Sequence, residues 1–261
     1  MPDAIHPLRH HDVPPESIPT GEQLLDRASK PYLAWVPAGK SIVLGNSQDP
    51  EKELNLDAIS MDGIPVFKRM SGGGAVLLSP GCVCLGLRFA KDKSLSIQDF
   101  FAKGSALISG VALEKLGVRL VSRGTSDLAY TGSFSHAGGP IPEQPGGQAT
   151  HSGQPETSET TGYDHTHHTH RKVAGCALYM PRDFVLYLVS ILIDADISDI
   201  GKYLAYPSKE PQYRAGRKHE DFLAGLASLS TTPVRPSEFA GWLEEIIPDA
   251  PGLNLDWELA R

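Results

Sequence analysis

Apolar residues along this chain form short runs of β type that are separated by turn residues, with fewer segments at helical spacing. The clearest helix spans residues 97–116, where Phe100, Leu107, Val111 and Leu113 recur roughly at helical intervals before a glycine. Helices are also predicted at residues 21–28, 49–63, 196–206 and 237–247. Strands are predicted at residues 32–36, 41–45, 64–70, 75–78, 82–90, 128–132, 171–180 and 184–194. This mixture predicts an α+β fold.

Two segments lack this patterning. Residues 1–20 are rich in Pro and His, and we interpret them as a flexible N-terminal arm. Residues 132–170 are rich in Gly, Pro and His and contain no Lys or Arg, so they offer too little apolar surface to form a core. We therefore expect a single domain at residues 21–261 that carries a disordered insert at 132–170 between two strands of a hairpin.

Composition narrows the class of function. The chain has 261 residues, 40% of them apolar, and its 24 basic against 31 acidic residues give a net charge of −7, which disfavours nucleic-acid binding. No apolar run reaches the roughly 20 residues that a membrane span requires. The three cysteines cannot all pair in disulfides, and no targeting segment is recognised, so we expect a cytoplasmic protein.

The strongest local motif is Lys-Arg-Met-Ser-Gly-Gly-Gly-Ala-Val at residues 68–76. Consecutive glycines let backbone N–H groups approach an anion, and the adjacent Arg69 offers a bidentate donor to phosphate or carboxylate. A flexible hairpin turn is the simpler interpretation of the glycines taken alone.

The surrounding motifs extend this signal. Residues 43–76, 124–130, 171–177 and 191–226 follow one another in an order that resembles the lipoate-protein ligase A group of the biotin and lipoate protein ligase superfamily, over about residues 20–230. The resemblance implies a mixed, largely antiparallel sheet flanked by helices, like the catalytic core of class II aminoacyl-tRNA synthetases and biotin synthetase. It also implies a lipoate- or octanoate-protein ligase that uses ATP and Mg²⁺ to form an acyl-adenylate.

By the same resemblance, Lys172 is the catalytic residue, because the family's lysine at this position contacts the acid's carboxylate and the adenylate phosphate. Asp127 is the candidate Mg²⁺ ligand, although a turn or cap acid is an equally simple interpretation of it. The residues implied to bind substrate or nucleotide are Arg69, Ser71, Gly72, Gly73, Gly74, Ala75, Gly124, Thr125, Asp127, Gly175, Cys176 and Ala177.

The implied partner is the lipoyl domain of a 2-oxoacid dehydrogenase or a glycine-cleavage carrier protein. Because the chain ends at Arg261, without room for the accessory domain of many bacterial ligases, we expect one of three arrangements. A separate accessory protein helps, the single domain acts alone, or the protein performs only the transfer half-reaction.

Two alternatives remain open at this point. Cys176 lies four residues after Lys172 and could carry an acyl group as a thioester, which would make the protein an ATP-independent octanoyl or lipoyl transferase. Val189-Ser190 stand where many family members have His-Gly, which leaves room for a non-catalytic binder of lipoate or of a lipoyl domain. The histidines of residues 165–170 could bind a transition metal, although a solvated spacer is the simpler interpretation.

Overall fold

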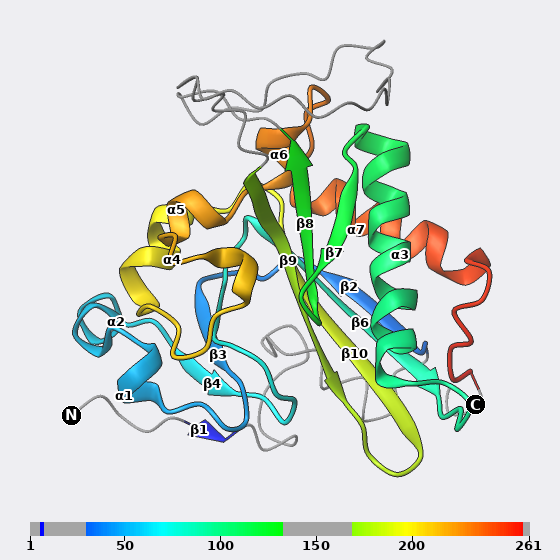
Figure 1. The fold of residues 1–261 in the computed structure, drawn as a ribbon, viewed down its shortest axis with the longest axis horizontal. Coiled ribbons are helices and arrows are strands. Elements are labelled where there is room, and N and C mark those ends of the chain that lie inside the picture. Colours follow the sequence, from blue (N-terminus) through cyan, green and yellow to red (C-terminus); the bar gives the residue numbers. More distant parts are fainter. Residues whose placement is uncertain (1–5, 8–29, 133–168, 258–261) are drawn as a thin grey trace, which may run out of the picture.

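The computed structural model describes residues 6–7, 30–132 and 169–257. Two sheets and a set of helices make up this part of the chain (Figure 1). Within it, no helix is both long and apolar enough to cross a bilayer. The helix predicted at residues 21–28, most of the arm at 1–20 and most of the insert at 132–170 lie outside the described residues.

The larger sheet has six strands and is antiparallel throughout. In spatial order its strands are β2 (Tyr32–Trp35), β6 (Cys82–Ala90), β10 (Phe184–Leu192), β9 (Thr169–Tyr179), β8 (Asp127–Gly132) and β7 (Leu120–Arg123). The strands that flank the insert pair as a hairpin closed by Gly132 opposite Thr169, as their sequences predicted.

The smaller sheet has four strands and is mixed. Its spatial order is β1 (His6–Pro7), β4 (Val66–Lys68), β3 (Ser41–Leu44) and β5 (Val76–Leu78). Strands β1, β4 and β3 run parallel to one another, and β5 runs antiparallel to β3.

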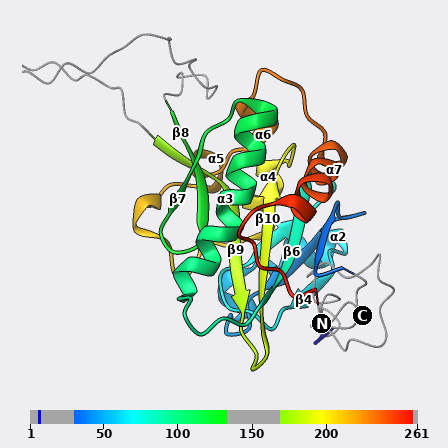
Figure 2. The ribbon, with the colours of Figure 1, turned by 90° about the vertical axis from the view of Figure 1, so that its right-hand side faces the viewer.

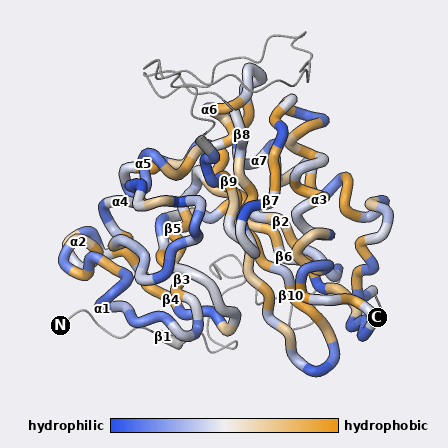
Figure 3. Tube along the Cα trace, viewed as in Figure 1, coloured by the Kyte–Doolittle hydropathy of each residue, from blue (hydrophilic) through white to orange (hydrophobic). Residues whose placement is uncertain are grey.

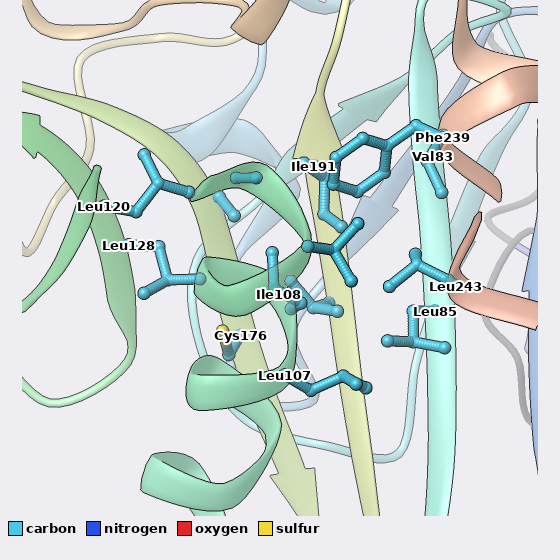
Figure 4. Close-up of a cluster of buried hydrophobic side chains, with 14 of the residues drawn as sticks. Val83, Leu85, Leu107, Ile108, Leu120, Leu128, Cys176, Ile191, Phe239 and Leu243 are labelled. Atoms are coloured by element: carbon cyan, nitrogen blue, oxygen red, sulfur yellow. The ribbon is translucent and has the colours of Figure 1, made fainter. Parts of the chain in front are cut away.

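Helices α3 (Ile97–Leu116) and α7 (Pro236–Ile246) cover one face of the six-stranded sheet (Figure 2). Their apolar side chains interdigitate with those of β6 and β10 in the main core (Figure 4). Labelled there are Val83, Leu85, Leu107, Ile108, Leu120, Leu128, Cys176, Ile191, Phe239 and Leu243. A second cluster of buried side chains lies between the other face and the smaller sheet, so the domain has three layers.

Short helices complete both cores. Helices α2 (Leu56–Asp62), α4 (Ile197–Tyr203) and α5 (His219–Phe222) and the 3₁₀ turn η3 (Gln212–Arg214) pack into the second core, which α1 (Pro50–Glu53) joins at Leu54. Helix α6 (Leu226–Leu229) and the 3₁₀ turn η4 (Ile247–Asp249) contribute to the main core. Polar residues gather on the connections, for example in the turn between β9 and β10 (Figure 3).

The helix predicted at residues 97–116 is confirmed to the residue. Ser96 and Asp99 form a reciprocal capping box at its start, and Gly117, at φ +68°, ends it. Leu113 was predicted on the apolar face, but it is 46% exposed, so that assignment was wrong. Six residues separate it from Leu107, which places the two side chains about 240° apart around the helix axis and therefore on different faces.

The helix predicted at residues 49–63 is wrong as one element, because it is broken into α1 and α2. Asp49 caps the first helix as predicted, and Asn55 caps the second. At the break, Leu54 pairs with Leu204, and the N–H of Asn55 donates to the carbonyl of Tyr203 at 2.9 Å. Tertiary pairing with the residues after α4 therefore overrides the local helical pattern.

Candidate active site

A cavity of about 820 Å³ lies between the two sheets. Strands β3 and β5 of the smaller sheet and strands β6, β9 and β10 of the larger one contribute to its wall, together with the residues that follow α4. Its size falls in the ordinary range for a small-molecule pocket, about 300–1,000 Å³.

One row of paired residues crosses the larger sheet beneath this cavity. The backbone register places Asp127 opposite Gly175, Gly175 opposite Ser190, Ser190 opposite Cys84 and Cys84 opposite Trp35. All five line the cavity. The floor of the cavity therefore changes from charged at β8 to apolar at β2, over five strands about 4.8 Å apart.

The charged end of this row is an ion pair. The Nζ atom of Lys172 lies 2.7 Å from Oδ1 of Asp127, and the hydroxyl of Tyr213 donates to Oδ2 of Asp127 at 2.9 Å. Burial, followed by the charge of Asp127, raises the pKa of Tyr213, which keeps its hydroxyl protonated as a donor. The lysine side chain is 26% exposed and lines the cavity, so its ammonium group is fixed but still reachable.

A β-bulge explains the Lys-Val-Ala-Gly spacing. Leu128 pairs with Ala174 but Ala129 pairs with Lys172, so Val173 is an extra residue in β9. In a regular strand, residues 172 and 175 would face opposite sides of the sheet. Here a Cβ atom on Gly175 would lie 2.9 Å from Nζ of Lys172 and 3.1 Å from its Cε. The glycine leaves the space in which the lysine side chain reaches Asp127.

The glycine loop closes another wall of the cavity, and Arg69 holds it. The guanidinium of Arg69 is 8% exposed and donates to the carbonyls of Gly72 (2.7 Å), Gly74 (2.9 Å) and Val43 (3.3 Å). Gly73 has φ +98°, and a Cβ atom there would lie 2.8 Å from Nη2 of Arg69. The arginine therefore positions the loop. It also lines the cavity, so its predicted contact with substrate stays a prediction.

The other predicted residues of the glycine loop differ in whether they line the cavity. Gly73, Gly74 and Ala75 line the cavity, whereas Ser71 and Gly72 are not part of its wall. Ser71 is 1% exposed, and its carbonyl accepts from the N–H of Asn46 at 3.0 Å.

Gly124 and Thr125 belong to the turn between β7 and β8. Gly124 has φ +56°, a conformation that glycine adopts readily, and this turn precedes Asp127 directly. Thr125 lines the cavity and Gly124 does not.

The side chain of Cys176 lies on the far side of the sheet from Lys172. Its Sγ is 2.9 Å from the hydroxyl of Tyr187 and belongs to the core beneath α3 (Figure 4). Burial raises the pKa of the thiol to about 12, which disfavours the thiolate that thioester chemistry needs. Cys176 still contributes to the cavity wall, as does Ala177, whose Cβ lies 4.0 Å from where a Cβ on Gly73 would lie.

The residues present do not form a Mg²⁺ site of their own. Both carboxylate oxygens of Asp127 are engaged, one by Lys172 and one by Tyr213. Across residues 30–132 and 169–257, no three His, Cys, Asp or Glu side chains gather closely enough to hold a metal ion. Asp127 therefore fits the role of a lysine partner better than that of a metal ligand.

Of the histidine tract, only His170 belongs to the described residues. Its ring nitrogens lie 2.7 Å from Nη2 of Arg123 and 2.7 Å from Oγ1 of Thr131. The remaining histidines of residues 165–170 lie outside the described residues.

Several residues of the site were missed from the sequence. Tyr213 and Arg214 come from the segment after α4, which the resemblance at residues 191–226 covered without marking either residue as part of the site. Gly45 packs against the glycine loop so closely that a Cβ there would overlap the carbonyl oxygen of Gly73. The Leu-Gly-Asn string was part of the family resemblance, and an obligatory glycine in it was a signal that could have been used.

The fold and the cavity define an α+β domain in which a fixed ammonium group and a glycine loop face the same cavity. The catalytic-domain model of the lipoyl protein ligase A/B family matches residues 20–246. The chain belongs to this family, and the predicted resemblance is confirmed.

Solved structures show the same fold. A bipartite lipoate protein ligase from Thermoplasma acidophilum, described with its E2 lipoyl domain, is 16% identical with a TM-score of 0.58 over 84% of this chain and 69% of its own. LipL1 of Plasmodium falciparum in complex with lipoate is 18% identical with a TM-score of 0.52, over 85% and 51%. A lipoate-protein ligase A bound with ATP is 18% identical with a TM-score of 0.53, over 81% and 68%. The predicted fold class is thereby confirmed.

Proposed function

We propose that this protein is a lipoate- or octanoate-protein ligase, which activates the acid with ATP and transfers the acyl group to a lysine of a lipoyl domain. One observation carries the proposal: Lys172, the lysine that the family resemblance marks, is held by Asp127 in the wall of a cavity whose floor becomes apolar away from it. Relatives of the same fold include one in complex with lipoate, one bound with ATP and one described with its E2 lipoyl domain.

The polarity of the cavity floor matches a medium-chain acid. A carboxylate near Lys172 leaves its hydrocarbon chain over Gly175, Ser190 and Cys84, and each buried CH₂ contributes about 0.8 kcal/mol. An eight-carbon acid is about 10 Å long, which equals roughly two strand separations of 4.8 Å.

In the first step, a carboxylate oxygen of the acid attacks the α-phosphorus of ATP, and the bond to the β-phosphate oxygen breaks. The products are acyl-AMP and pyrophosphate. Lys172 reduces the repulsion between the two anions and stabilises the charge that develops on the phosphoryl oxygens. Because Asp127 and Gly175 already fix the ammonium group, little reorganisation is needed when the substrates arrive.

In the second step, the amine of the carrier lysine attacks the acyl carbonyl, an amide forms, and AMP leaves with the bonding electron pair. The carrier amine loses a proton in this step, and the carboxylate of Asp127, which lines the same cavity, accepts it. The partner that fits this chemistry is a lipoyl domain.

Acid-dependent exchange of labelled pyrophosphate into ATP tests the first step. We expect exchange with lipoate or octanoate and little with biotin. Lys172→Ala should abolish it, while Lys93→Ala, which changes an exposed lysine outside the cavity, should leave it intact.

Other outcomes would replace the proposal. Acyl transfer from an octanoyl carrier without ATP, lost in Cys176→Ala, would establish the transferase. Saturable lipoate binding with neither exchange nor transfer would establish a non-catalytic binder.

A further inference from the structure

The hydroxyl of Tyr213 contacts the carboxylate oxygen of Asp127 that Lys172 leaves open. Lys172 contacts Oδ1 at 2.7 Å, and the hydroxyl donates to Oδ2 at 2.9 Å. The terminal torsion of an aspartate is broad, so a carboxylate with one fixed partner can still turn, whereas two fixed partners define one orientation. The hydroxyl therefore determines how the carboxylate presents Oδ1 to the ammonium group.

The ring of Tyr213 is held by two other aromatic rings. Its centre lies 5.2 Å from that of Phe222, at an interplanar angle of 47°, and 6.4 Å from that of His170, at 75°. Phe222 is itself buried. Because tilted and edge-on ring contacts favour particular ring positions, the hydroxyl reaches Asp127 from a fixed ring.

Arg217 holds the 3₁₀ turn η3, which carries Tyr213. Its guanidinium donates to four backbone carbonyls, those of Tyr213 (2.8 Å), His170 (2.9 Å), Arg214 (3.0 Å) and Asp221 (3.3 Å). His170 lies on β9, two residues before Lys172. One side chain therefore joins the turn to the strand that carries the lysine.

The backbone between Tyr213 and Arg217 adopts an unfavourable conformation. Ala215 and Gly216 both have positive φ angles, of +51° and +73°. Glycine adopts such angles readily, whereas a residue with a Cβ atom does so uncommonly. Unfavourable angles persist where the surrounding contacts over-determine them, and they cluster at functional sites. Here the side chain of Arg217 returns to η3 and supplies those contacts.

We propose that Tyr213 and Arg217 are positioning residues for Lys172. This inference rests on the proposed ligase function. Arg217 places Tyr213 against β9, and Tyr213 orients the carboxylate of Asp127, which holds the ammonium group. Neither Tyr213 nor Arg217 is part of the cavity wall, so both act through Asp127 and not by contact with a ligand. An ammonium group that is fixed in advance stabilises developing charge with little reorganisation, so its loss of orientation should lower kcat more than it raises KM.

Tyr213→Phe tests the proposal, because it removes the donor oxygen and keeps the ring. In pyrophosphate exchange we expect kcat to fall roughly five-fold or more, while KM for the acid and for ATP changes less than about two-fold. A purely structural role would change the stability of the fold and leave kcat of the folded enzyme unaltered. Arg217→Lys, which keeps the charge and loses the fork, should act in the same direction.

The matched control is Tyr206→Phe. Tyr206 also lies between α4 and α5, but it is 50% exposed and its hydroxyl donates to Glu210. This variant should have the kcat of the wild type.

Acylation of Lys172 by acetic anhydride gives a readout that does not need catalysis. The ion pair protects the amine, so mass spectrometry should show labelling of Lys172, relative to the exposed Lys93, that is roughly three-fold faster in Tyr213→Phe. Asp127→Asn should also label faster than the wild type. Adding Tyr213→Phe to Asp127→Asn should change the labelling little, because the hydroxyl acts through the carboxylate.

The proposal is overturned if Tyr213→Phe leaves the labelling of Lys172 as in the wild type. It is also overturned if Tyr213→Phe changes the labelling equally with and without the carboxylate of Asp127. Should Tyr213→Phe fail to fold, the labelling of Lys172 in Arg217→Lys decides in the same way.

Failure of the ligase function has a different signature. Faster labelling of Lys172 in Tyr213→Phe, in a protein whose wild type exchanges pyrophosphate with no acid, would retain the positioning of the lysine and reject the ligase. Acid-dependent exchange whose kcat is unaltered in Tyr213→Phe would retain the ligase and reject the positioning role.

Discussion

Gly175 is the residue on which the position of Lys172 depends. In Gly175→Ala, the new Cβ would lie 2.9 Å from Nζ and 3.1 Å from Cε of the lysine, so the flexible side chain must move away from Asp127. We expect pyrophosphate exchange to fall at least ten-fold while the unfolding free energy changes by less than about 1 kcal/mol.

Gly39→Ala is the matched control, because a Cβ at Gly39 would meet no atom within 4 Å. It should leave exchange unchanged. Wild-type exchange in Gly175→Ala would mean that the observed position of Lys172 is not the active one.

The three cysteine thiols should be poorly reactive in the folded protein. Cys82, Cys84 and Cys176 are all buried, and burial raises the pKa of each thiol. The folded protein should therefore react slowly with a disulfide reagent at pH 8, and the denatured protein should react rapidly at all three. A single fast thiol in the folded protein, mapped to Cys176, would revive the thioester route.

Two glycines of α3 allow a comparison within one element. Gly110 lies on the exposed side, and a Cβ there would meet nothing within 4 Å, whereas a Cβ on Gly104 would lie 2.5 Å from the ring of Tyr187. We expect Gly110→Ala to raise the unfolding free energy by about 0.5–1 kcal/mol. We expect Gly104→Ala to lower it by about 1–3 kcal/mol, because the core is overpacked.

Urea denaturation of both variants measures the two changes. Equal effects of the two substitutions would contradict the packing of α3 against β10. Because both positions are in the same helix, the difference between the variants removes the contribution of helix propensity.

The same helix shows which elements local sequence can specify. Ser96, Asp99 and Gly117 lie within or next to the segment that they delimit, so its limits were predictable. The break between α1 and α2 was not, because it depends on the N–H of Asn55 meeting the carbonyl of Tyr203, far along the chain.

In the candidate site, too, local sequence marked some residues, whereas the roles of others depend on contacts with distant parts of the chain. The Lys-Val-Ala-Gly and glycine strings marked Lys172 and the loop, yet the roles of Arg69 and Asp127 became visible only from their partners. Neither Tyr213 nor Arg214 was singled out from the sequence, because Tyr213 matters through its hydrogen bond to Asp127 on β8 and Arg214 through its place in the cavity wall.

At the scale of the whole molecule, His219 links stability to pH. Burial, followed by the charge of Arg214, lowers its pKa below 6.5, while Glu220 opposes the shift. Above pH 6.5 the imidazole is neutral in both the folded and the unfolded state. Below it, the unfolded chain takes up the proton first, so the unfolding free energy falls, by at most about 1.4 kcal/mol per pH unit for this group.

Urea denaturation at pH 7.5 and pH 5.5 checks the sign. The fall in unfolding free energy between the two pH values should be smaller in His219→Gln than in the wild type. An equal or larger fall in the variant would show that His219 does not contribute, since the carboxylates act alike in both proteins.

The β8–β9 hairpin fixes the two ends of the segment that joins its strands. Its ladder is closed by Gly132 opposite Thr169, so the ends of whatever connects them are held about 5 Å apart. The entropy of closing a connection grows only logarithmically, by about 0.6 kcal/mol per doubling of its length. A connection of a different length would therefore begin and end at the same two residues, and the register that aligns Asp127 with Gly175 would be kept.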